Sequence, residues 1–402
     1  MKVLMFGWEF PPYTTGGLGT ACYALTKGLS QNGVKTTFVV PYADKNSEAE
    51  FVDLISTNKI GNLTIINVSS PLTQYATYES YEDQLSKLNK GLRELYGHNL
   101  YEEVYRYSLI AAQLSKEIEH DVIHCHDWMT YQAGINAKEI SGKPLVIHIH
   151  NTVFDRASLK PNGHEYHIEK MGFEHADKII AISNKVKDML VHKYGINPEK
   201  IQVVHWGIEE NDPDYNLEVR KPFKTKIVIF VGRITLQKGP DYFIEAAKKV
   251  LDFEPDTRFI MVGTGDMLPK IINRAIELGI SDKLTFTGWF SKKDVYKAFK
   301  LADVFVMPSV SEPFGLVALE AIKNHIPVII SKQSGVSEVL KHCLKVDFWD
   351  VNELTNKLVG VLRYKTLHKE LKENSIEESK KFNLDEPAKK VIHVYRQVKT
   401  KW

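Results

Sequence analysis

Short apolar runs alternate with amphipathic segments along the first half of the chain. The pattern predicts a strand over 3–6, a helix over 20–31 and a strand over 36–40, which together form a βαβ unit. The range 44–120 is less regular, apart from a helical pattern over 109–118. Further strands are expected at 121–128, 144–149, 178–181 and 201–204.

The second half repeats this rhythm. Strands are expected at 226–231, 258–262, 284–287, 303–307 and 327–331, and helices at 240–251 and 382–402. Because 402 residues exceed what one hydrophobic core usually holds, we expect an α/β protein with two doubly wound domains. The linker composition of 211–214 places their boundary, which gives domains at 1–210 and 211–381. The final helix is expected to pack back on the first domain.

The charge balance changes this picture little. The sequence has 52 basic and 50 acidic residues and a formal net charge of +2, so bulk charge gives no argument for a nucleic-acid partner. Contact of a local basic patch with a membrane surface stays open. Cys22, Cys125 and Cys343 are too few and too widely spaced for a disulfide framework or a zinc motif. No apolar run is long enough for a signal peptide or a membrane span, and we expect a cytoplasmic protein.

The stretch VMPSVSEPFGLVALE joins an apolar strand to an apolar helix. Ser309 and Ser311 can cap that helix, and Gly315 opens it with N–H groups that suit a phosphate or a sugar hydroxyl. Glu312 and Glu320 are separated by on the order of 12 Å if both are helical. That exceeds the roughly 5–9.5 Å between the carboxylates of a glycosidase, so we expect separate tasks on one long ligand. Alternatively, Glu312 is a cap and Glu320 a solvated helix residue.

Two loops carry groups that suit an anion. Arg233 and Lys238 lie in a strand-to-helix loop, where a guanidinium and a mobile ammonium can hold a diphosphate. The alternative is two exposed surface cations. Gly16 and Gly17 lie where an earlier loop meets a helix, so the backbone can approach an anion closely. Their pattern is GGLG rather than the dinucleotide fingerprint GxGxxG, and ordinary turn glycines are the alternative.

Polar side chains also follow two strands of the first half. His126, Asp127, His148 and His150 lie near carboxyl ends of strands, where ligands bind in open α/β sheets. Two histidines on one strand face and a nearby aspartate raise the question of a metal. The sequence shows no residues that would orient such ligands, and we expect no metal. Tyrosines between 75 and 107 could line a carbohydrate surface, but we favour ordinary packing for them.

Five stretches together resemble the GT-B glycosyltransferases, specifically glycosyltransferase family 4 and its glycogen and starch synthase relatives. They are GWEFPPYTTGGLGTACYALTKGL, DVIHCHDWMT, HIHNTVFDR, FVGRITLQKG and SEPFGLVALEA, in the family's order from Gly7 to Ala321. The resemblance implies a GT-B fold, with two Rossmann-like domains facing across a cleft. It also implies that the N-terminal domain lies on the acceptor side and that the C-terminal domain binds a nucleotide sugar.

The resemblance implies roles for the candidates of the second half. Arg233 and Lys238 match the pair that holds the departing diphosphate. Glu312 matches the residue that holds hydroxyls of the donor sugar, and Glu320 matches the one that hydrogen-bonds the donor ribose. The backbone positions that match ligand-contacting turns are Gly263, Gly265, Phe314, Gly315 and Leu316.

The first half is matched in the same way. His150 matches a histidine beside the transferred sugar, and Asp127 matches an aspartate near the reacting face. Gly16 and Gly17 match the loop whose amides touch phosphate or sugar. Bacterial glucan synthases that use ADP-glucose carry KTGGL in this loop, whereas Thr14 stands here at the lysine position. The missing cation leaves the donor nucleotide and the glucan acceptor open.

The implied reaction is retaining transfer of a hexose, with glucose expected, from UDP- or ADP-glucose to a carbohydrate acceptor, without a metal or other cofactor. One alternative is a transferase of the same family that acts on a lipid, a cell-surface polysaccharide or a small molecule. Others are a nucleotide-sugar epimerase and a sugar-nucleotide-binding protein without catalysis. The complete set of acidic and basic candidates favours the transferase. The sequence leaves the oligomeric state open.

Overall fold

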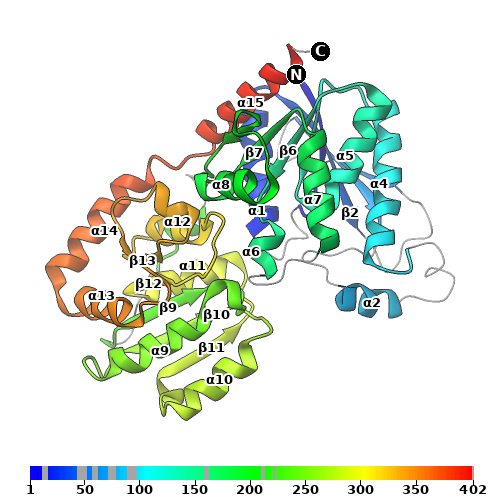
Figure 1. The fold of residues 1–402 in the computed structure, drawn as a ribbon. Helices are drawn as coiled ribbons and strands as arrows, with labels where there is room; N and C mark the ends of the chain where they lie inside the picture. Colours follow the sequence, from blue (N-terminus) through cyan, green and yellow to red (C-terminus); the bar gives the residue numbers. More distant parts are fainter. Residues whose placement is uncertain are drawn as a thin grey trace. The chain divides into compact units, whose positions relative to one another are not determined.

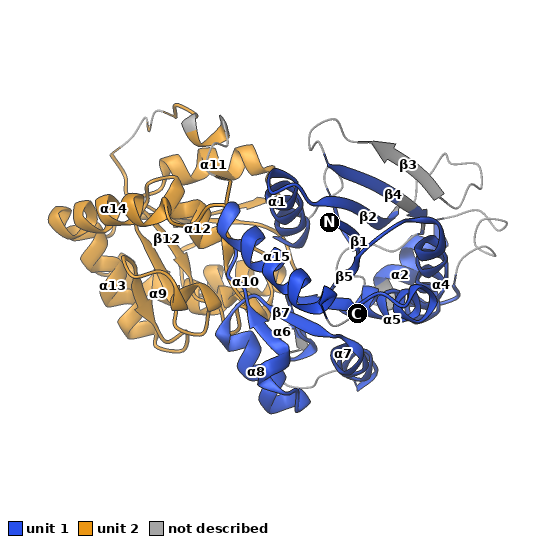
Figure 2. Cartoon of the chain, turned by 90° about the horizontal axis from the view of Figure 1, so that it is seen from above, with its two compact units in different colours: residues 1–206, 384–402 blue, residues 207–383 orange. Residues whose placement is uncertain are grey.

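The computed structural model describes residues 1–10, 17–42, 52–56, 62–70, 78–87, 97–157, 163–209, 213–219, 221 and 224–400. The chain divides into two compact units, coloured separately in Figure 2. Unit 1 consists of Met1–Trp206 and Leu384–Trp402, and unit 2 of Gly207–Asn383. Each is an α/β unit around its own sheet, and the predicted class of two doubly wound Rossmann-like domains is confirmed.

Unit 1 contains a sheet with the strand order β3-β4-β2-β1-β5-β6-β7-β8. Figure 1 labels β2, β6 and β7 of this sheet. β3 pairs antiparallel with β4, and the other described neighbours pair in parallel. The strands are β1 Lys2–Phe6, β2 Lys35–Tyr42, β3 Val52–Ser56, β4 Leu63–Ser69, β5 Val122–His126, β6 Leu145–Ile149, β7 Lys178–Ala181 and β8 Ile201–Val203.

The described residues of unit 1 also form helices. They are α1 Gly17–Gln31, α2 Tyr78–Ser86, α4 Leu100–Glu117, α5 Trp128–Ser141, α6 Val153–Ala157, α7 Gly163–His175, α8 Asn184–Tyr194 and α15 Asp385–Lys399. The helix predicted over 109–118 is wrong at its start. Asn99 caps α4 by accepting from the N–H groups of Tyr101 and Glu102, so the helix begins well before the apolar run.

Two of the described tyrosines of this region, Tyr81 and Tyr107, serve packing, as favoured from the sequence. Tyr81 and Tyr107 are buried, and the Tyr107 hydroxyl lies 3.2 Å from the carbonyl oxygen of Val39. Tyr105 is exposed. Tyr75 and Tyr96 lie outside the described residues.

Helix α15 follows unit 2 in the sequence but packs in unit 1. It contacts α1 at Gly28, where a Cβ atom would lie 2.7 Å from the Leu384 carbonyl oxygen and 2.9 Å from the Ala388 Cβ. Only glycine permits an approach this close. At its other end the Tyr395 hydroxyl lies 2.5 Å from Nδ1 of His124 on β5. The helix therefore reaches the centre of the sheet.

Unit 2 contains a parallel sheet with the order β11-β10-β9-β12-β13-β14. The strands are β9 Ile227–Val231, β10 Arg258–Val262, β11 Leu284–Gly288, β12 Val304–Met307, β13 Val328–Ser331 and β14 Leu344–Val346. The helices are α9 Pro240–Leu251, α10 Leu268–Glu277, α11 Lys292–Leu301, α12 Leu316–Lys323, α13 Val351–Arg363 and α14 Lys365–Ser379. This is the strand order of a dinucleotide-binding Rossmann sheet.

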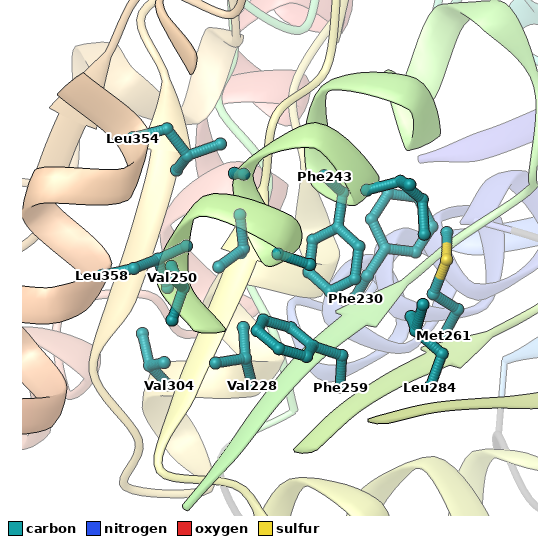
Figure 3. Close-up of a cluster of buried hydrophobic side chains, with 14 of the residues drawn as sticks. Val228, Phe230, Phe243, Val250, Phe259, Met261, Leu284, Val304, Leu354 and Leu358 are labelled. Carbon is teal, nitrogen blue, oxygen red and sulfur yellow. The ribbon is translucent and has the colours of Figure 1, made fainter. Parts of the chain in front are cut away.

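One core of unit 2 lies between its sheet and three helices (Figure 3). Phe230 and Phe259 of the sheet pack against Phe243 of α9, with ring centroids 5.6 and 5.9 Å from Phe243. Leu354 and Leu358 of α13 complete the cluster on one side. Such burial of large side chains contributes roughly 1.5–3 kcal/mol each, which fixes the strands whose loops are described next.

Both sheets have a switch point, where the connections leave the first strand in opposite directions. In unit 1 it lies between β1 and β5, and in unit 2 between β9 and β12. In open α/β sheets, ligands bind outside the carboxyl ends of the strands at such a point. Among the described residues, no helix has both the length and the apolar character needed to cross a lipid bilayer.

Candidate functional site

The loops after β9 and β12 meet at the switch point of unit 2. Gly239, with φ 65, ends the first loop, and a Cβ atom there would lie 2.1 Å from the Pro308 carbonyl oxygen. The N–H groups of Val310 and Ser311 donate to the Gln237 carbonyl oxygen at 2.9 and 3.3 Å. These backbone contacts hold the two candidate loops together.

An ion pair joins the side chains of these loops. Lys238 Nζ lies 2.5 Å from Glu312 Oε2, and the Ser309 hydroxyl donates to the same oxygen at 3.4 Å. The Glu312 side chain is 8% exposed and that of Lys238 20%. Arg233, half-buried in the same loop as Lys238, donates to Gln237 Oε1 at 3.2 Å. The structure thus brings the predicted lysine and the first predicted glutamate into contact.

The helix of the predicted motif begins where the sequence suggested, directly after Gly315. Gly315, at φ 111, is the residue before α12, and no side chain caps this end. The expected caps Ser309 and Ser311 are therefore wrong. Because Glu312 precedes the helix, the separation calculated for two helical glutamates does not apply. Glycine is favoured here because other residues rarely adopt this φ, and a Cβ atom would also lie 2.9 Å from Met307 Cε and 3.2 Å from Glu312 Cγ.

The other motif positions lie around this turn. Phe314 is buried, and its carbonyl oxygen accepts from the Val336 N–H at 2.7 Å. Leu316 is the first residue of α12, whose N-terminal end carries a partial positive charge. Glu320 lies on the same helix and is half-buried. The turn therefore joins the ion pair to a helix end that suits an anion or a hydroxyl.

Gly263 and Gly265 serve the packing of the Arg233 loop. Gly263, at φ 133, would place a Cβ atom 2.0 Å from the Gly232 carbonyl oxygen. A Cβ atom on Gly265 would lie 2.2 Å from the Ile234 carbonyl oxygen. Both glycines let the loop after β10 lie directly against the loop after β9.

In unit 1, the loop after β1 enters α1 at its switch point. Gly16 and Thr14 lie outside the described residues. Gly17 is the exposed first residue of α1. Glu9, which the sequence analysis did not single out, is buried, and its carboxylate accepts from the Gly19 N–H at 3.0 Å. A carboxylate at a helix N-terminus is stabilised by the helix dipole.

Asp127 follows β5 and holds the end of β6. Its Oδ1 accepts from the His150 N–H at 2.7 Å and from the Asn151 N–H at 3.4 Å. The residue keeps some exposed surface, but its carboxyl group lies among buried groups, and burial raises the pKa of Asp127 to about 7. The structure therefore brings the predicted Asp127 and His150 together.

Four histidine rings form a stacked column beside this pair. His124 and His126 come from β5 and His148 and His150 from β6. Neighbouring ring centroids lie 4.4–5.4 Å apart, and Trp206 stacks on His148 at 5.1 Å. His126 Nδ1 lies 2.9 Å from His150 Nε2. Burial lowers the pKa of all four histidines, that of His126 to about 3, so the column is uncharged at neutral pH.

The column raises the metal question again. Cys22 with His126 and His150 forms one group of potential ligands, and His124, His126 and His148 form another. In the second group, the three rings are stacked and inclined by 10–28° to one another. A metal binds along the plane of each ring, and these nearly parallel planes direct their lone pairs side by side rather than to one point. In the first group, His126 Nδ1 and His150 Nε2 lie 2.9 Å apart and form a hydrogen bond with each other. The packing therefore favours the uncharged column over a metal centre.

A buried ion network supports the loop that follows β6. Arg156 donates to the Asn151 carbonyl oxygen at 2.6 Å and forms ion pairs with Glu165 at 2.7 Å and Glu169 at 2.9 Å. Glu169 is fully buried and also accepts from the Val153 N–H at 3.0 Å. The sequence analysis missed this network because its members are up to 18 residues apart without a motif.

Comparisons with known proteins cover both units. Residues 2–202 match the family described as starch synthase catalytic domain, and residues 214–382 match glycosyl transferases group 1. An uncharacterized glycosyltransferase of Methanocaldococcus jannaschii is 30% identical over 357 residues, which cover 85% of this chain and 83% of that protein.

Two solved structures share the fold. Sucrose-phosphate synthase from Thermosynechococcus elongatus matches with a TM-score of 0.78 and 20% identity, over 100% of each chain. The HepE protein of Anabaena, solved in complex with UDP and glucose, matches with a TM-score of 0.70 and 15% identity, over 99% of this chain and 100% of that one.

Proposed function

Since the chain belongs to the group 1 glycosyltransferases with the GT-B fold, we propose that it transfers a hexose from a nucleoside-diphosphate sugar to a carbohydrate acceptor with retention of configuration. The starch synthase match of the N-terminal half supports a glucan acceptor. The UDP and glucose bound to HepE of Anabaena support glucose as the sugar and make UDP-glucose the first donor to test, with ADP-glucose second. The reaction would take place in the cytoplasm.

The ion pair of Lys238 and Glu312 carries this proposal. It joins a cation and a carboxylate that are 74 residues apart in the sequence, at the switch point where such sheets bind ligands. Arg233 and Lys238 would hold the diphosphate, and Glu312 would hold hydroxyls of the sugar. Glu320 would bind the ribose, and backbone amides at the start of α12 would contact the ligand.

The role proposed for unit 1 rests on the polar residues at the ends of its strands. His150 would lie beside the transferred sugar, and Asp127 would hold its backbone in place. The loop that contains Gly16 and Gly17 would contact phosphate or sugar through its amides. In this assignment, unit 1 supplies the acceptor side and unit 2 binds the donor.

The reaction would proceed without a covalent enzyme intermediate. The bond between the anomeric carbon and the phosphate oxygen breaks, and its electron pair stays on the nucleoside diphosphate. Arg233 and Lys238 stabilise the charge that develops there. The acceptor hydroxyl attacks from the side of the leaving group and gives its proton to the departing phosphate. The new glycosidic bond to the acceptor replaces the bond to phosphate, and the anomeric configuration is retained.

A donor panel tests this function. The purified chain is incubated with UDP-, ADP- and GDP-glucose, each with and without a glucan, and nucleotide release and product linkage are measured. We expect nucleotide release that requires the acceptor and an α-linked product. An altered sugar that still carries its nucleotide would identify an epimerase, and binding without turnover would identify a binding protein.

A non-glucan acceptor is the second candidate. Thr14 replaces the lysine of the ADP-glucose-dependent bacterial synthases, which favours a different donor or acceptor. Nucleotide release that a lipid or a small sugar stimulates and glucan does not, with the hexose recovered on that acceptor, would support this candidate.

A further inference from the structure

His126 is the one ring of the histidine column that makes a hydrogen bond to the predicted sugar-facing histidine. Its Nδ1 lies 2.9 Å from His150 Nε2, within normal hydrogen-bond distance. His126 is fully buried, whereas His150 is 8% exposed and is the most accessible ring of the column. The buried His126 is therefore placed to set the orientation and the protonated nitrogen of the more accessible His150.

One proton lies between the two facing nitrogens, because both rings are neutral. If His150 donated from Nε2, His126 Nδ1 would be the acceptor and would carry no proton. The single proton of the neutral His126 ring would then lie on its Nε2. That nitrogen is buried and has no hydrogen-bond partner among the described residues. A buried N–H without an acceptor is rare in proteins, so the opposite arrangement is favoured. His126 then donates from Nδ1, and only a lone pair stays unpartnered.

This arrangement determines what His150 offers. With Nε2 accepting from His126, the single proton of His150 lies on Nδ1. We propose that His126 is a positioning residue which fixes His150 as the Nδ1–H tautomer, so that His150 donates a hydrogen bond to a hydroxyl or ring oxygen of the bound sugar. The inference rests on the proposed function for its substrate, but the tautomer itself belongs to the ligand-free chain.

The surroundings support a fixed ring rather than a mobile one. Asp127 holds the His150 backbone N–H at 2.7 Å. Trp206 stacks on the His150 ring at a centroid distance of 5.3 Å and an angle of 17°. His148 also stacks on the His150 ring, at a centroid distance of 4.5 Å. Neither ring nitrogen of His148 has a hydrogen-bond partner in the described part of the chain. His148 therefore shares the stack but lacks the hydrogen bond.

That difference provides a matched control. His126→Phe keeps an aromatic ring in the column and removes the donor, and His148→Phe makes the same change where no hydrogen bond exists. His126→Asn restores an N–H near the position of Nδ1 without restoring the ring. Circular dichroism and thermal unfolding establish that each variant is folded.

The first readout is the tautomer, measured by NMR on chains with ¹⁵N-labelled histidine, with His150 assigned by loss of its signals in His150→Gln. We expect the proton on Nδ1 in the wild-type chain, in His148→Phe and in His126→Asn. In His126→Phe we expect it to move to Nε2 or to exchange between both nitrogens. A wild-type His150 protonated on Nε2, or a tautomer that His126→Phe leaves unchanged, overturns the proposal.

The second readout is turnover with the donor identified by the panel. We expect kcat of His126→Phe to fall on the order of 10–100-fold while KM for the donor changes little, because the misplaced donor affects the reaction more than binding. His126→Asn should recover part of kcat, and His148→Phe should keep it. Equal losses in both Phe variants would point to packing alone and overturn the proposal. A wild-type chain that transfers no sugar contradicts the proposed function, whereas the NMR readout still decides whether His126 sets the tautomer.

Discussion

Asp127 has a backbone conformation, φ 58 and ψ 168, that glycine adopts far more easily than other residues. Such a conformation costs on the order of 1–3 kcal/mol and persists where the surroundings impose it. Here the carboxylate is required to reach the two N–H groups that begin the loop after β6. The strain therefore lies at the point where the site of unit 1 is positioned.

The pKa of Asp127 predicts how stability depends on pH. The folded chain keeps the proton up to about pH 7, whereas the ordinary value is 3.8. Between these values the folded state binds more protons than the unfolded state, so Asp127 lowers the free energy of unfolding as the pH rises towards 7. Asp127→Asn cannot ionise and can still accept both N–H groups. We expect it to be more stable than wild type at pH 8 by urea denaturation, with a smaller gain at pH 5.

The exposed Asp188 of α8 supplies the control for this experiment. Asp188→Asn should change stability little and equally at both pH values. An Asp127→Asn gain of the same size at pH 5 and pH 8 would show that the carboxyl group of Asp127 does not titrate in this range.

Arg233 and Lys238 give the second prediction at this scale. Arg233→Ala and Lys238→Ala should each lower kcat on the order of 10²–10³-fold, because each removes a cation at the charge that develops on the diphosphate. Lys248→Ala removes a half-exposed cation of α9 and should keep kcat. The measurement is initial-rate nucleotide release by folded variants. A folded double variant of Arg233 and Lys238 with near-normal turnover would refute their role.

At the scale of elements, the contact of α1 with α15 depends on one small residue. Gly28→Ala would force a Cβ atom to within 2.7 Å of the Leu384 carbonyl oxygen. Because backbone has to move, we expect a loss of about 1–3 kcal/mol in the free energy of unfolding, measured in urea. Gly163→Ala, at the start of α7, has open space around its Cβ and should stay within about 0.5 kcal/mol of wild type. Equal stability of the two variants would contradict the close contact.

Elements with a clear apolar period could be predicted from the sequence, but a helix end that is set by a side-chain cap could not. The helix over 240–251 agrees with α9, whose ends are marked by Gly239–Pro240 and a following polar turn. α12 begins directly after Gly315, as predicted, whereas α4 begins nine residues before its predicted start because the Asn99 side chain caps it. The apolar period alone does not show that Asn99 is this cap.

Some residues of the candidate site could be predicted from the sequence, and others could not. Strand ends and loop composition led to Lys238, Glu312, Asp127 and His150, and the structure pairs the first two and the last two. The column with Trp206 and the Arg156 network were missed, because residues far apart in sequence make them. The roles of these residues in binding and catalysis stay predictions.

At the scale of the whole molecule, the absence of a required metal is a prediction that a chelator tests. If Arg233, Lys238 and backbone amides stabilise the leaving diphosphate, activity in EDTA should equal that in buffer. Initial rates before and after dialysis against EDTA are compared. A loss of activity that zinc or another divalent ion restores would instead support a metal at the histidine column.

The return of α15 to unit 1 has a consequence for synthesis. Leu384 and Ala388 cover the surface of α1 around Gly28, and Tyr395 supplies the hydroxyl partner of His124. All three residues follow unit 2 in the sequence. While the ribosome is still translating unit 2, the first sheet is therefore left with an uncovered apolar flank. A nascent chain stalled before residue 384 should bind chaperones and be cleaved by proteases more readily than one that includes α15.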